Sequence, residues 1–387
     1  MKKFSTERSE LVATPIIQIE PWIDEIEEGL LVDSIRTKYV TEHEFTSRFE
    51  RQIENLTGAK HAVAMTNGTA ALFCAFKALG LQPGDEVIVP NITFVATANA
   101  AIMAGLKPVL CEIEQDYFCI DTEKASGLIT ERTKAIVPVH LYGQSANMGK
   151  VMAFAKKHNL FVVEDAAQGV GVMHKGQHVG TIGDIGILSF YGNKTITCGE
   201  GGVVITNSKE LRDACYRLKN HGRDKKGIFI HQEIGFNFAF TEMQAAVGLA
   251  QMTKLNNVIN QKRKIHEKYV RELAGIPGFQ FCKINHEVTT HPVFWFTSAL
   301  AEKRQELQDF LSERGIGSRL FFYPMHQQPC YAGMKREMGI REDDPGQFHY
   351  SEFVYSRGIS LPSSYNLTDE QQDRIIGAVK AFYEGNK

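Results

Sequence analysis

The chain has 387 residues, of which 43% are hydrophobic and 23% charged, and its formal net charge at pH 7 is -2. This composition is typical of a globular protein, and the length predicts two domains or one large domain with a smaller appendage. The near-neutral charge gives no electrostatic reason to expect a nucleic acid or an anionic membrane as partner. No apolar run approaches the ~20 residues that span a bilayer.

The cysteines and the N-terminal segment bear on the compartment. The seven cysteines are scattered, and none forms a CxxC pair of the kind found in zinc sites. The segment MKKFSTERSELVATP begins with two lysines but contains no apolar stretch typical of a secretory signal. We therefore expect a reducing, cytoplasmic location, no disulfide framework and no metal.

A strand, a tight turn and a helix are predicted around residue 68. The strand covers His61–Met65 and the helix Ala70–Leu79, with Gly68 and Thr69 between them. Such a junction aims free backbone N–H groups and the positive end of a helix at one point, which suits an anion. An ordinary strand-to-helix connection has the same pattern, so both interpretations stay open here.

Strands and helices alternate through the next hundred residues. Strands are expected over Glu86–Val89, Pro108–Ile113, Ala135–Val139 and Phe161–Glu164, and helices over Thr93–Ala104 and Met148–Lys157. This alternation predicts a parallel or mostly parallel sheet covered on both faces. Ligands of such sheets bind beyond the carboxyl ends of the strands, where Asp165 and Gln168 are expected.

One lysine stands in a loop between two further predicted strands. Lys194 follows the strand Ile185–Phe190 and precedes a glycine-rich turn and the strand Val203–Thr206. An amine in a partly desolvated pocket loses its proton more readily, and the neutral amine can form an imine with a carbonyl. Enzymes that use pyridoxal phosphate need such a lysine; a solvated loop lysine is the alternative interpretation.

The second half of the chain is predicted to contain a connecting helix and a smaller domain. A helix is expected over Ser208–Asn220, followed by a basic loop and a long helix from Thr241 to about Leu273. We interpret this helix as the connector between a large domain, residues 1–250, and a small C-terminal domain, residues 251–387. Further elements are expected at Phe279–Ile284, Pro292–Ser298, Lys303–Arg314 and Asp369–Tyr383.

A pyridoxal phosphate site needs more than a lysine. It needs a carboxylate for the pyridine nitrogen, an anion cradle, a flat group against the ring and a donor to the phenolic oxygen. The chain offers these groups in Asp165, in Gly68 and Thr69 with Ser189, in Phe94 and in Gln168. Each also has a structural interpretation: a helix cap for Asp165, a buried strand hydroxyl for Ser189 and a core side chain for Phe94.

Six ordered segments carry a family resemblance: NGTAAL, PGDEVIVPNITFVATANA, TKAIVPVHLYGQ, VEDAAQGVG, GDIGILSFYGNKTITCGEGG and IGFNFAFTEMQAAVGLAQ. Together they resemble the DegT/DnrJ/StrS family of pyridoxal phosphate-dependent sugar aminotransferases. The resemblance covers nearly the whole chain. It implies an α/β protein of the aspartate aminotransferase type, fold type I, with a large domain around a mostly parallel sheet and a smaller C-terminal α/β domain.

The resemblance also assigns residues. It implies that Lys194 bonds covalently to pyridoxal 5'-phosphate and that Asp165 faces the pyridine nitrogen. It places the phosphate on the Gly68 and Thr69 amides and the Ser189 hydroxyl, the ring against Phe94 and a further contact at Gln168. Asn237 resembles the residue that family members insert into the neighbouring subunit's site, which implies a homodimer with shared active sites.

The substrate is implied less closely. The resemblance implies ping-pong transfer of an amino group from L-glutamate to a nucleotide-linked keto sugar. FYGNKTIT, FFYPMHQQP and SRGISLPSS most resemble perosamine synthase-like members, which aminate carbon 4 of a GDP-linked 4-keto-6-deoxyhexose for polysaccharides such as lipopolysaccharide O-antigen. Candidate substrate contacts, each with a structural alternative, are His231, Arg319, Tyr323, His326 and Arg357.

Several alternatives stay open. Many members have an arginine where this chain has Ala239, so a diphosphate contact is missing or comes from elsewhere, such as Arg223 or Lys225. A dTDP- or UDP-linked 3- or 4-keto sugar is therefore a second substrate class. Related deoxygenating enzymes have a histidine in place of the lysine, and Lys194 argues against that reaction. A non-catalytic regulator or scaffold would not need all of these cofactor positions.

Overall fold

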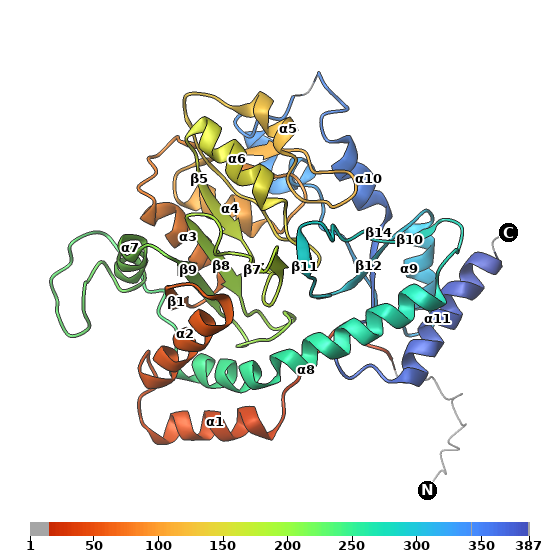
Figure 1. Cartoon of the computed structure of the whole chain (residues 1–387), viewed down its shortest axis with the longest axis horizontal. Coiled ribbons are helices and arrows are strands. Elements are labelled where there is room, and N and C mark those ends of the chain that lie inside the picture. The colour runs from red at the N-terminus through yellow and green to blue at the C-terminus, as the bar shows by residue number, and fades with distance from the viewer. Residues whose placement is uncertain (1–14, 342, 386–387) are drawn as a thin grey trace, which may run out of the picture.

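The fold consists of a large sheet sandwiched by helices and a smaller sheet packed beside it (Figure 1). The computed structural model describes residues 15–341 and 343–385, so all of the N-terminal segment discussed for secretion except Pro15 lies outside the described residues. A third, short sheet pairs β6 (Met173–His174) with β7 (Gln177–His178) and β11 (Thr289–His291).

The largest sheet has seven strands in the order β1-β9-β8-β5-β4-β2-β3. Within it β9 is reversed, because it pairs antiparallel with both β1 and β8, and the other strands run in one direction. The bounds are β1 His61–Met65, β2 Glu86–Pro90, β3 Lys107–Cys111, β4 Thr133–Ile136, β5 Phe161–Asp165, β8 Ile185–Ser189 and β9 Gly202–Thr206. The predicted mostly parallel sheet is confirmed.

Alternate residues of these strands pack into different cores. Val87 and Val89 of β2 face one hydrophobic core, and Ile88 between them faces another. Likewise Val204 of β9 faces the first core, and Val203 packs on the opposite side. Because both faces are covered, the strands carry continuous apolar runs rather than a strict alternation of apolar and polar residues.

Helices cover both faces of the large sheet. Residues of α3, α4 and α7 pack into one core, and residues of α2, α6 and the first half of α8 pack on the other side. The helices are α1 Glu25–Arg36, α2 Glu44–Thr57, α3 Gly68–Ala78, α4 Ala96–Met103, α5 Thr122–Ala125, α6 Met148–His158, α7 Lys209–Lys219, α8 Glu242–Glu272, α9 Arg304–Ser312, α10 His349–Arg357 and α11 Asp369–Glu384.

The C-terminal part forms a second core. Its antiparallel sheet has the order β10-β12-β14-β13, with bounds β10 Phe279–Phe281, β12 Thr297–Ala301, β13 Arg319–Leu320 and β14 Gly358–Leu361. The helices α9 and α11 pack on it, together with Ile265 and Tyr269 from the second half of α8. The long helix thus contributes to both cores, and its role as a connector between two domains remains a prediction.

Several elements differ from the sequence prediction. The helix expected from Thr93 begins at Ala96, and the Thr93 hydroxyl contacts the Thr97 hydroxyl at 3.2 Å instead of capping a helix. Residues 292–296 form a connection, and the strand β12 begins only at Thr297. The helix α1 is not among the elements predicted from the sequence, although Asp24 and Glu27 form a capping box at its start.

Some residues that follow the proposed domain boundary at residue 250 pack with the large domain. Met325, Tyr331, Met338 and Phe348, far beyond that boundary, pack into a core of the large sheet. The two-domain division with this boundary therefore remains a prediction, in which part of the C-terminal region returns to the large domain.

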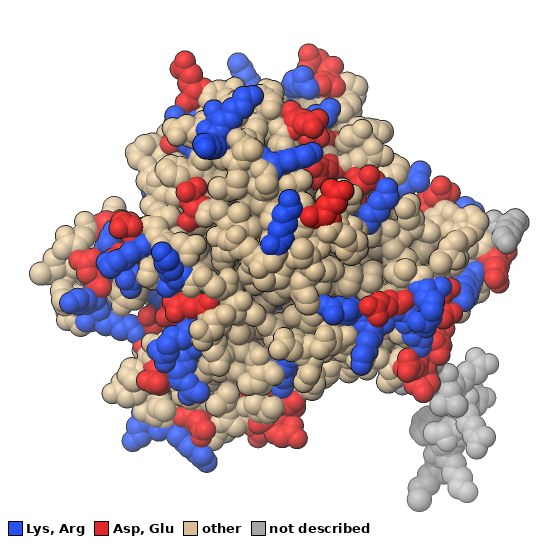
Figure 2. Space-filling model, in the orientation of Figure 1, with Lys and Arg blue, Asp and Glu red and all other residues tan. Residues whose placement is uncertain are grey.

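Three further features of the molecule concern its surface charge, the hydropathy of its helices and the arrangement of its possible metal ligands. Basic and acidic side chains are interspersed over the face shown in Figure 2. Within residues 15–341 and 343–385, no helix is long and apolar enough to cross a membrane. The same residues contain no cluster of three or more histidine, cysteine or carboxylate side chains arranged to hold a metal ion.

Candidate active site

A cavity of about 840 Å³ opens at the carboxyl ends of β5 and β8. This is the edge of a parallel sheet at which ligands are expected. Seven of the predicted cofactor and catalytic residues line the cavity: Gly68, Thr69, Phe94, Asp165, Gln168, Ser189 and Lys194. Four segments distant in sequence thus bring these residues to one place.

The start of α3 forms one end of the cavity. Asn67 caps this helix by accepting a hydrogen bond from the Ala70 N–H at 2.9 Å. The N–H groups of the first turn have no partner within the helix, and the helix dipole makes this end attractive to anions. A Cβ atom on Gly68 would lie 3.3 Å from the Ser189 Oγ atom. The glycine therefore lets the serine hydroxyl stand beside the helix terminus.

Asp165 ends β5 at the floor of the cavity. It is 4% exposed, and its Oδ2 atom accepts a hydrogen bond of 2.7 Å from the Thr97 hydroxyl. Its Oδ1 atom accepts a hydrogen bond of 3.1 Å from the Ala167 N–H. Both bonds fix the orientation of the carboxyl group, which lies where it could face the ring nitrogen of a cofactor.

Gln168 is fixed by one hydrogen bond. Its Oε1 atom accepts from the backbone N–H of Tyr142 at 3.0 Å. Because the carbonyl end of the amide is engaged there, the Nε2 end is the one available as a donor. This orientation provides the donor expected for the phenolic oxygen of the cofactor.

Lys194 enters the cavity from the loop between β8 and β9. Burial lowers the pKa of its amine to about 8, although the Asp165 carboxylate opposes the shift and Arg319 adds to it. At neutral pH a usable fraction of such an amine is unprotonated, unlike that of an ordinary lysine. A neutral amine can attack a carbonyl, and the assignment of Lys194 as the catalytic lysine remains a prediction.

Aromatic side chains form a wall of the cavity. Phe94 is 57% exposed, so it is not the core side chain of the alternative interpretation, and its ring lies 6.0 Å from that of Phe322. Phe94 is thus free to pack against a flat ligand.

The candidate substrate contacts separate into two groups. Arg319 and Tyr323 line the cavity. His326, Arg357 and His231 are absent from the lining of this cavity within the described chain. His326 Nε2 lies 3.1 Å from a Glu352 carboxylate oxygen, and Arg357 forms an ion pair with Glu302. The assignment of all five as substrate contacts remains a prediction.

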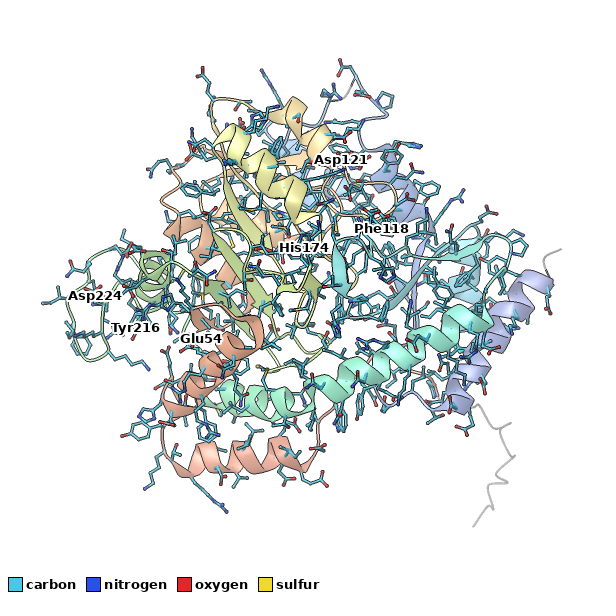
Figure 3. The ribbon with its side chains drawn as sticks, viewed as in Figure 1. Glu54, Phe118, Asp121, His174, Tyr216 and Asp224 are labelled. Atoms are coloured by element: carbon cyan, nitrogen blue, oxygen red, sulfur yellow. The ribbon has the colours of Figure 1, made fainter. Side chains whose placement is uncertain are left out.

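Asn237 also lies outside the cavity lining of its own chain. It follows a segment, residues 222–236, that projects from the body next to α7 (Figure 1). Asp224 lies towards the outer end of this segment and Tyr216 on α7 near its base (Figure 3). The segment exposes apolar side chains: Ile228, Phe229, Ile230 and Ile234.

Three residues of the site were not predicted from the sequence. Thr97 bonds to Asp165, the Tyr142 N–H bonds to Gln168, and the ring of Trp295 lies 4.2 Å from the Lys194 Nζ atom. Trp295 is one of only two tryptophans in the chain, and this rarity was the available signal.

The residues present fit pyridoxal phosphate. The anion end formed by α3 and Ser189 provides for a phosphate, Asp165 for a ring nitrogen and Lys194 for an aldehyde. A side chain on Gly68 would crowd Ser189, so the close approach at the anion end depends on a glycine.

Comparison with known proteins agrees with this geometry. Residues 21–380 match the DegT/DnrJ/EryC1/StrS aminotransferase family. A GDP-perosamine synthase from Vibrio cholerae is 36% identical over 371 residues, which cover 94% of this chain and 98% of that protein. One from Escherichia coli O157:H7 is 37% identical over 342 residues, covering 88% and 90%.

Solved structures show the same fold. The crystal structure of DesV from S. venezuelae superimposes with a TM-score of 0.89 at 30% sequence identity, covering 96% of this chain and 99% of DesV. The chain therefore belongs to the DegT/DnrJ/EryC1/StrS aminotransferase family and is a pyridoxal phosphate-dependent aminotransferase.

Proposed function

We propose that this enzyme transfers the amino group of L-glutamate to carbon 4 of a GDP-linked 4-keto-6-deoxyhexose. The observation that carries the proposal is the similarity to GDP-perosamine synthases along nearly the whole chain, together with the reactive Lys194 at the floor of the cavity. The product would be an amino sugar for polysaccharide synthesis. The free state of all seven cysteines supports a reducing, cytoplasmic setting.

The residues of the cavity have distinct roles in this proposal. When bound, pyridoxal phosphate supplies an aldehyde that carries the amino group and a ring that withdraws electrons. Lys194 would bond covalently to the cofactor and, as a free amine, would move a proton at the reacting carbon. Asp165 would face the ring nitrogen, and the Ser189 hydroxyl with the Gly68 and Thr69 amides would bind the phosphate.

The sugar nucleotide would enter past Arg319 and Tyr323. Both line the cavity and belong to the C-terminal part of the chain, whereas the cofactor groups belong to the large sheet. A guanidinium at this entrance suits a diphosphate. Arg223, considered as a substitute for the arginine replaced by Ala239, donates to the Asn220 side chain at 2.7 Å and so is engaged within its own loop.

A panel of nucleotide-linked keto sugars assayed with glutamate tests the substrate. The GDP-linked 4-keto-6-deoxyhexose should be the best acceptor, and dTDP- and UDP-linked 3- or 4-keto sugars should be poor ones. Preference for one of the latter would overturn the proposed nucleotide but not the transamination. A colourless protein that cannot be reconstituted with pyridoxal phosphate would instead favour a non-catalytic role.

We further infer a homodimer in which each subunit contributes Asn237 to its partner's site. Phe229 is 81% and Ile234 87% exposed in segment 222–236. Exposed apolar side chains that lie together mark interaction surfaces, which supports burial of this segment against a second subunit. Asn237 is exposed and outside its own cavity, which leaves it free to reach another subunit.

Mixed dimers test the shared site. Lys194→Ala chains and chains with Asn237→Ala should each be nearly inactive alone. After subunit exchange, a mixed dimer gathers both lesions in one site and leaves the other intact. About half of random pairs are mixed, so activity should rise towards roughly a quarter of wild type. Proven exchange without recovered activity would show that Asn237 acts within its own chain.

A further inference from the structure

Trp295 makes two contacts that converge on the catalytic lysine. Its indole N–H donates a hydrogen bond of 2.6 Å to the carbonyl oxygen of Asn193, the residue before Lys194. The face of its ring lies 4.2 Å from the Lys194 Nζ atom. One side chain thus holds both the backbone that carries the lysine and the amine at its tip.

Trp295 is itself firmly held. It is 2% exposed, and its ring stacks on that of Phe296 with a centroid separation of 3.9 Å. Its carbonyl oxygen accepts a hydrogen bond of 3.1 Å from the Nζ atom of Lys262 on α8, which also donates to the Ser363 carbonyl at 2.8 Å. These contacts fix the ring against the cavity before any ligand binds.

The face of an indole is the most favourable aromatic surface for a cation, and the attraction grows when water is excluded. In a transamination the lysine is covalently bound to the cofactor at rest and is released in each half of the cycle. A released lysine side chain has several rotatable bonds, so without a further contact it would populate many conformations in which the amine is too far from the reacting carbon.

We propose that Trp295 is a positioning residue for Lys194. The face of the indole ring holds the released lysine amine beside the reacting carbon through both halves of the reaction. The expected effect of Trp295 on the reaction rate rests on the proposed aminotransfer. The contact between the Trp295 ring and the Lys194 amine does not depend on that proposal. The indole N–H contributes separately, because it fixes the carbonyl of Asn193 and with it the direction in which the lysine leaves the loop.

The chain provides an internal comparison in its other tryptophan. Trp22 stacks on Tyr365 with a centroid separation of 4.7 Å, and the Lys254 amine lies 5.5 Å from its ring. Lys254 is ion-paired with Asp24 and Glu27. The amine beside Trp22 is thus held by carboxylates, so this pair shows a tryptophan beside an amine in a structural setting.

Fluorescence of the cofactor-free protein tests the contact without substrate or turnover. A Trp22→Phe variant leaves Trp295 as the single tryptophan, and an ammonium in contact with an indole quenches its emission. Emission should rise from about pH 6.5 to about pH 9.5, either side of the pKa of about 8 that burial gives Lys194. The rise should disappear when Lys194→Met is added.

Other charged groups must be separated from this signal. Asp165 and Arg319 face Lys194, and Lys262, whose pKa burial lowers to about 7, faces the Trp295 carbonyl. The rise should therefore persist in Trp22→Phe with Lys262→Met. Emission that does not change with pH, or that changes equally without the Lys194 amine, would overturn the proposal.

Kinetics test the catalytic consequence. Trp295→Phe keeps a ring face, and Trp295→Leu removes it, while both lose the N–H contact. At saturating glutamate the rate at which the visible absorbance band disappears should be about two- to thirtyfold lower for the leucine than for the phenylalanine variant. The KM for glutamate should change little. Equal rates in two folded variants would overturn the proposal, and the substrate panel remains an independent test of function.

Discussion

Two buried lysines of this chain have opposite surroundings. The Nζ atom of Lys219, on α7, lies 3.2 Å from a Glu42 carboxylate oxygen and 3.6 Å from one of Glu50. Burial alone would lower its pKa, but the two carboxylates raise the pKa above that of an ordinary lysine. Lys194 has no carboxylate in ion-pair contact within the described chain, and burial lowers its pKa to about 8.

The difference shows what makes a lysine reactive. Burial is common to both side chains, so burial alone does not produce a nucleophile. A carboxylate in direct contact keeps Lys219 charged and confines it to a structural role. At Lys194 the neighbouring carboxylate, Asp165, is engaged by Thr97 and Ala167 instead, and burial outweighs its effect on the pKa of the lysine.

The largest expected effect is loss of the reactive amine. Lys194→Ala should abolish multiple turnover, a fall of more than about a thousandfold, because nothing else can hold the cofactor covalently and move the proton. The fold and noncovalent cofactor binding should persist, as checked by circular dichroism and by fluorescence titration with pyridoxal phosphate. Turnover close to that of the parent would contradict the assignment of this lysine.

The second expected effect is on stability. Lys219→Met should lower the free energy of unfolding by about 3–5 kcal/mol, because it leaves the Glu42 and Glu50 carboxylates without their buried partner. Lys209→Met on the same helix is the control: its ion pair with Asp213 is mostly exposed and should contribute at most about 1 kcal/mol. Urea unfolding of both variants measures the difference. Equal losses in the free energy of unfolding for the two variants would mean that the buried contacts of Lys219 stabilise the fold no more than an exposed ion pair does.

The third expected effect is electronic. Asp165→Asn keeps the shape of the side chain but not its charge, so a protonated ring nitrogen loses its counterion. The rate should fall about a hundredfold, which corresponds to ~2.7 kcal/mol. An unchanged rate with a normal cofactor spectrum would reduce Asp165 to a cap at the end of β5.

The smallest expected effect is a pH dependence. Covalent capture of pyridoxal phosphate by the cofactor-free protein requires the neutral amine of Lys194. Because its pKa is about 8, the capture rate should rise about tenfold per pH unit below pH 8 and level off above it. The growth of absorbance after mixing measures this rate. A rate still rising steeply near pH 10 would assign Lys194 an ordinary pKa.

The sequence predicted the parts of the site that depend on local pattern. The strand–turn–helix at Gly68 and the lysine between two strands follow from periodicity and glycine placement within a few residues. Asp165 followed from its position after an apolar strand. Their meeting in one cavity follows from the parallel sheet, whose strand ends share an edge.

Contacts between distant segments were beyond the sequence. Trp295 lies 101 residues from Lys194, in a segment whose apolar run predicted a strand rather than a connection. Thr97 was expected as an ordinary helix residue, and only the tertiary fold brings its hydroxyl to Asp165. His326 lies three residues after Tyr323 in the sequence and Arg357 ends α10, but their side chains pair with Glu352 and Glu302.

The continuous helix α8 also sets the mechanics of the molecule. Its 31 residues extend about 46 Å, with one end in the core beneath the large sheet and the other in the C-terminal core (Figure 1). Such a rod acts as a lever arm. A tilt of only about 5° at one end would move the other by roughly 4 Å, more than the length of a hydrogen bond. Arg319, carried by β13 of the C-terminal sheet, would then shift against Lys194, which stands on the loop that follows β8 of the large sheet.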